Sequence, residues 1–331
     1  MWLKMIEINI IDAFSDNYIY LIRNESKNLT SVVDPGESAP VIKFLKTRNW
    51  HLDEIINTHH HHDHIGGNAE LLNTYKSKLI APIYDKNRIS DIDVYVSDND
   101  LISIAGTKTK VIHTPGHTLE STSYILKDEN GKEHCIFTGD TLFLGDVGIP
   151  DVAQRYMGVS KEELAGILYE SVNNRIKPLP DDILVYPGHG AGSACGKNMM
   201  KETVDTLENQ KKINYALNGT FSKEGFVKEL TDNLPEPPTY FPSNVKLNQE
   251  GYLDFDKVLG RGLIPLELEK FINLSSQENT IILDVRNQNI FKNGFVPGSI
   301  FIGLNGGFAP WVGAVLKDIN IKILLVCEES Q

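Results

Sequence analysis

Cysteine is scarce in this chain of 331 residues, which contains three: Cys135, Cys195 and Cys327. Three thiols scattered this widely cannot form the disulfide framework of a small secreted domain. Long apolar runs are also lacking, since no stretch approaches the length of a membrane-spanning helix and the first residues lack the apolar core of a signal peptide. We therefore expect a soluble, cytoplasmic protein without a membrane partner.

Basic residues are too few and too dispersed for nucleic-acid binding. Lys and Arg number 32, and Asp and Glu number 44, which gives a formal net charge of −12. No basic block and no alternation of aromatic and basic residues occurs in the sequence, so nucleic acid is not an expected partner. The length suffices for two domains with ordinary cores.

The most informative stretch that is present covers residues 58–67 and reads Thr-His-His-His-His-Asp-His-Ile-Gly-Gly. The apolar run at 54–58 predicts a short buried strand, and the residues after the histidines predict a turn that opens a helix. In a loop between these elements, His59 and His61 can point to one position. Asp63 and His64 can point to a neighbouring one. Imidazole nitrogens and carboxylate oxygens are ligands of zinc, iron and manganese.

Three later segments carry ligands of the same types, each after an apolar run typical of a strand. They are residues 113–118, 137–143 and 185–190, which supply His117, Asp140 and His189. A solvated polar loop would not explain four matching segments in order, so the sequence predicts a metal site. A non-catalytic binding protein is the alternative interpretation, and such a protein would have to retain the full ligand set without using it for catalysis.

The order H-x-H-x-D-H, followed by His, Asp and His, resembles the pattern of the metallo-β-lactamase superfamily. The resemblance covers about residues 6–245 and implies an αββα sandwich with the metal at one edge. A capping box at Ser160 predicts the start of a helix that runs to about residue 173. Apolar periodicity predicts a helix at 38–49 and strands at 6–11, 18–22, 29–33, 109–113, 122–127 and 134–138.

The run from Pro187 to Lys197 is rich in glycine and other small residues, which let the backbone approach a site closely. This run resembles the persulfide dioxygenase branch of the superfamily, and more narrowly its fusions to a rhodanese domain. In those proteins it leads into a helix, which we expect over residues 197–213. Cys195 is a candidate catalytic residue, because a thiolate near the start of a helix is favoured by the helix dipole. A small buried cysteine is the alternative interpretation.

A proline-rich break at 234–242 precedes a part with different periodicity. We expect a short helix at 263–273 and buried parallel strands at 280–286 and 321–327. This part resembles a rhodanese domain, which implies that Cys327 carries sulfur at the start of an anion-binding loop.

Two features depart from the rhodanese pattern. Glu328 and Glu329 would repel an anionic sulfur substrate, and the sequence stops at Gln331, which implies a truncated domain. The predicted organisation is therefore an α/β metallo-β-lactamase sandwich over 1–245, followed by a partial α/β rhodanese-like domain over 246–331.

Two chemistries fit the ligand set. In the first, a persulfide dioxygenase uses O2 to oxidise the persulfide of a small thiol to sulfite and free thiol, in sulfide detoxification. The resemblance then implies one Fe(II) on His59, His117 and Asp140. The remaining ligand-type residues would orient these three side chains, and they are His61, Asp63, His64 and His189.

The alternative is a thioester hydrolase of the glyoxalase II type with two Zn(II). One zinc would be held by His59, His61 and His117. The second would be held by Asp63, His64 and His189, with Asp140 as the bridge. The ligands alone leave both chemistries open.

The rhodanese-like part favours the dioxygenase, since a persulfide-oxidising domain and a sulfur-binding domain make chemical sense together. We therefore expect an oxidoreductase with one Fe(II) per chain, acting on a small-molecule persulfide. Because superfamily relatives often dimerise, the resemblance also favours a homo-oligomer.

Overall fold

The computed structural model describes residues 6–128, 130–151, 158–193, 195–232, 234, 255–262, 264–305, 307–316 and 320–328. The chain folds into two compact units, residues 1–234 and 235–331. The domain boundary predicted at residue 245 lies outside the described residues. None of the helices in the described part is long and apolar enough to cross a membrane.

The first unit contains two six-stranded sheets, and the first of them takes its strands in chain order. An antiparallel meander of three strands is continued by three parallel strands. Because β3, β4 and β5 are parallel, their carboxyl ends meet at one edge. The strands are β1 (Ile6–Ala13), β2 (Asn17–Asn24), β3 (Leu29–Val33), β4 (Glu54–Ile56), β5 (Lys78–Pro82) and β6 (Val94–Val96).

The second sheet has the strand order β12-β11-β10-β9-β8-β7. Its neighbours pair antiparallel, except that β10 and β11 are parallel and so end at the same edge. The strands are β7 (Leu101–Ile104), β8 (Thr107–His113), β9 (Thr122–Lys127), β10 (Glu133–Gly139), β11 (Leu184–Pro187) and β12 (Asp205–Thr206). The strands predicted at 109–113, 122–127 and 134–138 are thereby confirmed.

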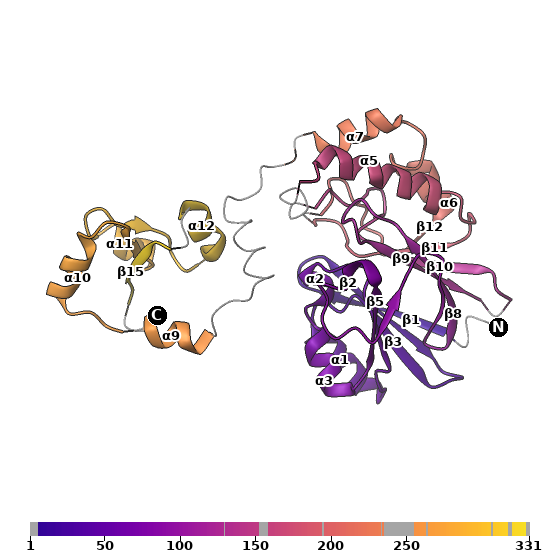
Figure 1. Cartoon of the computed structure of the whole chain (residues 1–331), viewed down its shortest axis with the longest axis horizontal. Coiled ribbons are helices and arrows are strands. Elements are labelled where there is room, and N and C mark those ends of the chain that lie inside the picture. Colours follow the sequence, from indigo (N-terminus) through magenta and orange to yellow (C-terminus); the bar gives the residue numbers. More distant parts are fainter. Residues whose placement is uncertain are drawn as a thin grey trace. The chain divides into compact units, whose positions relative to one another are not determined.

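Helices cover the outer face of each sheet. Figure 1 shows α1 (Ser38–Arg48) and α3 (Asn68–Tyr75) against the first sheet. The second sheet is covered by α5 (Lys161–Ser171), α6 (Leu207–Ile213) and α7 (Lys223–Thr231). Short helices complete the unit: α2 (His62–Ile65), the 3-10 turn η2 (Ile83–Asp85) and the π-helical η3 (Val172–Ile176). The layers confirm the predicted αββα sandwich.

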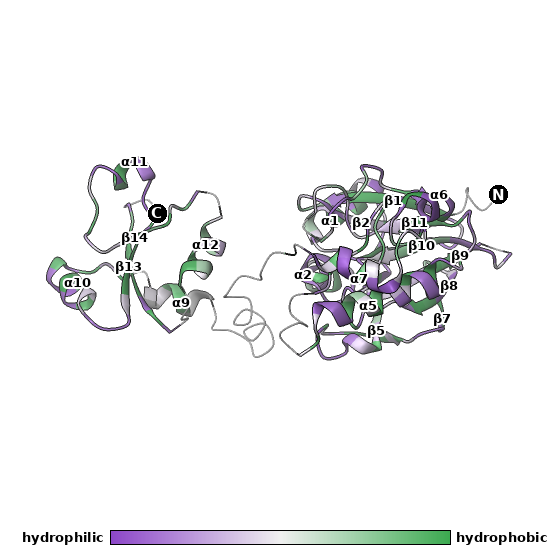
Figure 2. Cartoon of the chain, turned by 90° about the horizontal axis from the view of Figure 1, so that it is seen from above, coloured by the Kyte–Doolittle hydropathy of each residue, from purple (hydrophilic) through white to green (hydrophobic). Residues whose placement is uncertain are grey.

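Each contact between layers has its own apolar core. Tyr20 of the first sheet meets Tyr124 and Phe137 of the second sheet between the two sheets. Leu45 of α1 packs on the outer face of the first sheet, and Leu168 of α5 packs on that of the second. Figure 2 shows this pattern as hydrophobic strands, such as β1, and a mostly hydrophilic α7 on the outside. Burial on both faces of both sheets is what holds the loops at their common edge in place.

The capping box at Ser160 is confirmed, whereas the helix predicted over 197–213 is wrong for its first part. Ser160 Oγ accepts a hydrogen bond from Glu163 N, and the Glu163 carboxylate accepts one from Ser160 N. The other helix, α6, begins only at Leu207. Buried Asp146 explains the difference, because its Oδ2 accepts hydrogen bonds from the amides of residues 197 and 198 at 2.6 Å each and holds this segment in a turn.

The second unit is built around a parallel three-stranded sheet with the order β14-β13-β15. Its strands are β13 (Thr280–Asp284), β14 (Ile300–Phe301) and β15 (Lys322–Val326). Its helices are α9 (Phe255–Gly262), α10 (Leu268–Ser275), α11 (Gln288–Phe291) and α12 (Phe308–Val315). An ion pair lies at the end of the first of these strands, with Arg286 Nη2 2.7 Å from Asp284 Oδ2.

Candidate metal centre

Seven ligand-type side chains meet where four strands of the first unit end. His59 follows β4, and Asp63 and His64 lie in α2 just beyond it. The second sheet supplies the loop after β8, the end of β10 and the end of β11, which carry His117, Asp140 and His189. Strand ends are buried and rigid, so side chains placed there need little extra order to converge.

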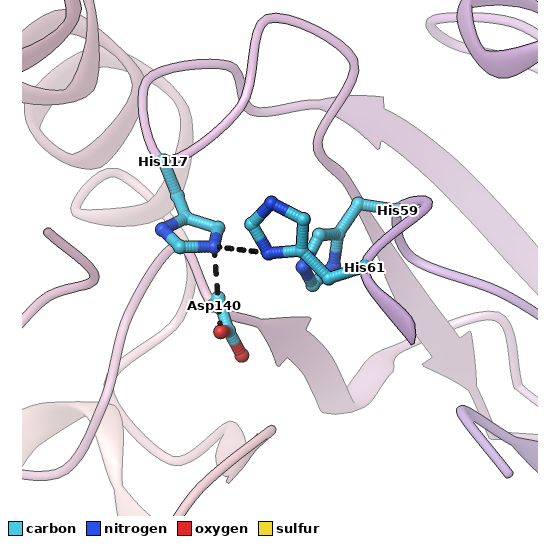
Figure 3. Close-up of side chains that lie close together, drawn as sticks. All are labelled: His59, His61, His117 and Asp140. Atoms are coloured by element: carbon cyan, nitrogen blue, oxygen red, sulfur yellow. Dashed lines mark hydrogen bonds and ion pairs between the residues drawn. The ribbon is translucent and has the colours of Figure 1, made fainter. Parts of the chain in front are cut away.

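The first group consists of His59, His61, His117 and Asp140, whose ligand atoms lie within 4.8 Å of one another. Figure 3 shows the three imidazole rings turned toward each other above the carboxylate. His117 Nε2 lies 3.0 Å from His61 Nδ1 and 3.5 Å from Asp140 Oδ2. Three nitrogens and one oxygen at this spacing could hold one metal ion.

The second group consists of Asp63, His64 and His189, and Asp140 joins it to the first. His64 Nε2 lies 3.3 Å from His189 Nε2, and Asp63 Oδ2 lies 3.2 Å from His189 Nε2. Asp140 Oδ1 is 3.3 Å from His64 Nε2, while its Oδ2 is 3.3 Å from His189 Nε2. The Asp140 carboxylate therefore lies between two neighbouring ligand groups.

Buried polar atoms without hydrogen bonds show that this cluster fits metal ions. His59 Nε2 and both carboxylate oxygens of Asp140 are buried and make no hydrogen bond. Leaving such atoms unsatisfied costs several kcal/mol in a protein interior, typically about 1–3 kcal/mol each. Cations bound between these atoms would satisfy them, since imidazole nitrogen and carboxylate oxygen are the donors that zinc and iron accept.

In the second group, the imidazole nitrogens that face away from the cluster are held by carboxylates of neighbouring residues. His64 Nδ1 lies 3.0 Å from Asp34 Oδ2, and His189 Nδ1 lies 2.8 Å from Asp16 Oδ1. These contacts favour the tautomer with a proton on Nδ1, so that Nε2 is free to bind a cation. Asn17 Nδ2 donates to Asp63 Oδ2 at 2.9 Å and fixes that carboxylate as well.

The first group is oriented by different partners. His117 Nδ1 lies 2.6 Å from the carbonyl oxygen of Ile149. His61 Nε2 lies 3.2 Å from Asp151 Oδ1, so His61 presents its Nδ1 to the cluster instead. The segment around residues 145–151 is therefore part of the site, and its residues Asp146 and Val147 are buried.

Burial and charge shift the pKa values of the clustered histidines in opposite directions. Burial lowers the pKa of His59 well below its ordinary value and that of His117 to about 4. Burial also acts on His64 and His189, but the Asp140 carboxylate outweighs it and raises the pKa of both imidazoles well above the ordinary value. Burial by itself would raise the pKa of Asp140, yet these two imidazoles hold it well below its usual range. In the metal-free protein, protons on these two imidazoles thus balance the Asp140 charge.

Two glycines allow the backbone to come this close. A methyl group on Gly188 would lie 2.4 Å from Asp140 Oδ1 and 2.9 Å from His64 Cε1. On Gly148 it would lie 1.9 Å from the Asp140 carbonyl oxygen and 3.1 Å from His117 Nδ1. Gly188, which directly precedes His189, thus lets the backbone approach the site closely.

The two candidate cysteines lie in different surroundings. Cys195 is half-buried, and its sulfur lies within 4.8 Å of ligand atoms of Asp140 and His189. Because α6 begins only at Leu207, no helix dipole acts on Cys195, and that part of the prediction is wrong. Cys327 is exposed in the second unit just after β15, and its sulfur-carrying role stays a prediction.

Sequence reasoning missed the residues that orient the ligands: Asp16, Asn17, Asp34 and Asp151. Asp34 could have been found, because it directly follows β3, which is parallel to β4 and ends at the same edge. Asp16 and Asn17 carry no such signal, since Asp16 lies in the turn between β1 and β2 and Asn17 is the first residue of β2. Only the pairing of this turn with residues 188–190 brings them to the site, through hydrogen bonds from Tyr18 N to Gly188 O and from Gly190 N to Asp16 O.

Known proteins similar to this chain include a hydroxyacylglutathione hydrolase from Pelagibacter ubique (strain HTCC1062). It is 40% identical over 245 residues, which are 73% of this chain and 91% of the relative. A metallo-beta-lactamase structure from Staphylococcus aureus subsp. aureus COL is 26% identical with a TM-score of 0.69, over 98% of this chain and 93% of its own. ETHE1 from Myxococcus xanthus is 27% identical with a TM-score of 0.59, over 74% of this chain and all of its own.

These findings contradict the predicted persulfide dioxygenase and the oxidoreductase class. Curated relatives with lower identity than the first also carry the name hydroxyacylglutathione hydrolase, a hydrolase. The comparisons give no support to the rhodanese-like assignment of residues 246–331. The prediction failed because it chose between two chemistries from that assignment and from the run between Gly190 and Lys197, whereas the ligand set itself favoured neither.

The sequence pattern, the four-layer fold and the ligand cluster all agree with one further comparison. The model of the Metallo-beta-lactamase superfamily matches residues 13–189, which include all seven ligand-type residues. The αββα architecture carries these residues at the edge that the resemblance implied. The chain belongs to the metallo-beta-lactamase superfamily, whose members bind metal.

Proposed function

We propose that this chain is a thioester hydrolase with two metal ions, acting on hydroxyacyl thioesters of glutathione. The observation that carries the proposal is the position of Asp140 between two complete ligand groups, 3.3 Å from His64 and His189 and 3.5 Å from His117. The Pelagibacter ubique relative, of which this chain covers 91%, is named for this hydrolysis and supports the choice of substrate.

The proposed metal ions are two Zn(II). His59, His61 and His117 would hold one of them. Asp63, His64 and His189 would hold the other, and Asp140 would contribute to both. Bound there, the ions would supply Lewis acidity, which makes a water-derived nucleophile available near neutral pH and polarises the thioester carbonyl.

The second group supports two ions over a single one. His64 Nε2, His189 Nε2 and Asp63 Oδ2 lie within 3.5 Å of one another. Their outer atoms are held by Asp34, Asp16 and Asn17 and point these three ligand atoms inward. Without an ion in the second group, the Nε2 atoms of His64 and His189 would face each other in a buried site with only protons between them and the neighbouring carboxylates. A second cation would take the place of those protons.

The protein's own contribution to the reaction is orientation. Asp34 and Asp16 hold His64 and His189 in place before substrate arrives, so little reorganisation is needed during the reaction. The leaving group is a thiol with a pKa of about 8.5, which departs as a thiolate without an acid to protonate it. This explains why the described site can lack a dedicated general acid next to the seven ligands and still cleave a thioester.

The test combines metal analysis with a thioester assay. Protein purified without chelator should contain about two divalent ions per chain, and it should release free thiol from S-lactoylglutathione. Asp140→Asn should lose both ions and the activity, because it weakens both groups. Glu7→Gln, a carboxylate-to-amide change in β1 away from the ligand cluster, is the control and should retain both. Full metal content without thiol release would overturn the proposal.

A further inference from the structure

The turn between β1 and β2 holds an aromatic side chain in a strained and exposed position. Phe14 has a backbone φ of +49° and its side chain is 52% exposed. The left-handed conformation costs a bulky aromatic residue free energy, whereas glycine or asparagine adopts it more easily. Backbone strain of this kind often clusters at functional sites.

Phe14 lies beside the backbone of Asp63. A methyl group built on Gly36 would lie 2.0 Å from the Asp63 carbonyl oxygen and 2.8 Å from Phe14 Cε2, so the ring and this carbonyl meet over Gly36. The amide of Phe14 donates to Glu37 Oε2 at 2.7 Å, which holds the turn in this position. Asn17, the first residue of β2 after this turn, donates to the Asp63 carbonyl at 3.2 Å.

Asp63 marks the side on which the metal cluster opens to solvent. Its side chain is 35% exposed and that of His61 is 24% exposed. The side chains of the other ligand-type residues are at most 3% exposed, and they are His59, His64, His117, Asp140 and His189. A substrate therefore reaches the cluster past Asp63 or His61, and a molecule that enters past Asp63 meets the ring of Phe14.

We propose that Phe14 is a specificity-determining residue: its ring forms an apolar wall at the Asp63 side of the site and contacts the acyl group of the thioester. This inference rests on the proposed hydrolase function and deepens it, because it names the substrate class as hydroxyacyl thioesters with an apolar or aromatic acyl side chain. An exposed ring gains by covering such a group, whereas a small polar acyl group offers it little contact area.

The experiment compares two substrates that differ only beyond the hydroxyl-bearing carbon. S-mandeloylglutathione carries a phenyl ring where S-lactoylglutathione carries a methyl group. In Phe14→Gly and Phe14→Asn, the ratio of kcat/KM for the phenyl substrate to that for the methyl substrate should fall about tenfold, the scale of a lost apolar contact. Both variants should keep the metal content of the unsubstituted chain, and both should melt at a higher temperature because the backbone strain is relieved.

The matched control is Tyr95→Ala, which removes an aromatic side chain of similar exposure, 51%, from the edge strand β6. This variant should leave the substrate ratio unchanged. If the Phe14 variants also leave the ratio unchanged while the chain hydrolyses both substrates, the apolar wall is overturned and the hydrolase function stands. A lower melting temperature with an unchanged ratio would instead identify Phe14 as a structural residue.

If the unsubstituted chain hydrolyses neither substrate, the proposed hydrolase function is wrong. The apolar wall formed by Phe14 is then tested by measuring ligand affinity. S-benzylglutathione and S-methylglutathione cannot be hydrolysed, and their affinities for the metal-loaded protein can be measured by calorimetry. A preference for the benzyl compound that is lost in Phe14→Gly would support an apolar wall for a different reaction. Equal affinities in both proteins would overturn it.

Discussion

Nδ1 of His189 lies 2.8 Å from the Asp16 carboxylate, although 173 positions separate the two residues along the chain. The contact exists because the turn between β1 and β2 pairs with residues 188–190 through an antiparallel bridge. A residue of the first sheet thereby orients a ligand that the second sheet delivers. The metal cluster depends in this way on both sheets, and the turn is part of its support.

Asp16→Asn should weaken the second metal group without removing the first. The neutral amide accepts a weaker hydrogen bond from His189 Nδ1 than the carboxylate does. Loss of such an orienting carboxylate typically costs about 10–100-fold in metal affinity or activity. Titration with Zn(II) should show one tight site as before and one weakened site. Asp12→Asn is the control, since Asp12 is exposed on β1. Equal weakening of both sites would contradict the assignment of His189 to the second group.

Gly116→Ala should destabilise the fold and displace His117. Gly116 has φ +139°, and a methyl group there would lie 2.3 Å from Cα of Leu168 in α5. Because the clash is with helix backbone, only a shift of α5 or of the Gly116 loop could relieve it. We expect a loss of about 3 kcal/mol in the free energy of unfolding, together with weaker metal binding.

Gly131→Ala separates the steric clash from the backbone strain. Gly131 also has a positive φ, +83°, but among the described residues no atom beyond its chain neighbours lies within 4 Å of an added methyl group. It should cost about 1 kcal/mol and leave metal binding intact. Urea denaturation of both variants measures the difference, and similar losses at the two positions would show that the Leu168 contact does not matter.

The three cysteines should react with iodoacetamide in a fixed order. Cys327 is exposed and should react first, whereas Cys135 is fully buried, and burial raises the pKa of its thiol, so it should react only after unfolding. Cys195 is half-buried beside Asp140 and His189 and should react in the metal-free protein. Added Zn(II) should slow the labelling of Cys195 alone. Mass spectrometry resolves the three sites. If Zn(II) leaves the labelling rate of Cys195 unchanged, its sulfur lies outside the metal site.

Asp98→Asn should lower stability at neutral pH but not in acid. The Asp98 carboxylate pairs with Arg175 of η3 and accepts a hydrogen bond from His113 N at 2.9 Å. Partial burial works against ionisation, but these two partners outweigh it and lower the pKa of Asp98 below its ordinary value. Because the folded pKa is depressed, this stabilisation is complete above the unfolded pKa of about 3.9 and disappears as the pH falls through the lower folded pKa.

The expected loss for Asp98→Asn at about pH 7 is at most about 1 kcal/mol, since the pair is partly solvated. Urea midpoints of the variant and the unsubstituted chain should converge in acid, once Asp98 is protonated in both states. Asp100 lies in the same turn and its carboxylate accepts a hydrogen bond from Ser97 N, so Asp100→Asn tests the turn without the Arg175 pair. A difference that persists in acid would show that the Arg175 pair is not its source.

Much of the metal cluster could be predicted from the sequence because its ligands follow strands. An apolar run identifies each strand, and His59, His117, Asp140 and His189 come within a few residues of such runs. The apolar period likewise predicted the helix at 38–49, and the capping box predicted the start of the helix at Lys161. These signals are local, so they survive without knowledge of the tertiary structure.

The choice of reaction could not be made in the same way. The seven candidate ligands are compatible with one iron or with two zinc ions. The choice between the two rested on residues beyond 245 and on the run between Gly190 and Lys197, which led to the wrong reaction. The helix expected from residue 197 failed for a related reason. Its propensity was outweighed by the buried Asp146 carboxylate, a tertiary contact that holds residues 197 and 198 in a turn.

By itself, the sequence determined which side chains are candidate ligands and which strands carry them, because both depend on residue type and on periodicity over a few positions. Only the tertiary structure decided how those ligands group, since the distances among Asp140, His64 and His189 arise from the packing of one sheet on the other. The same packing brought Asp16 to His189 and Phe14 to Asp63. Contacts between distant segments depend on how whole layers meet, and no local pattern encodes that meeting.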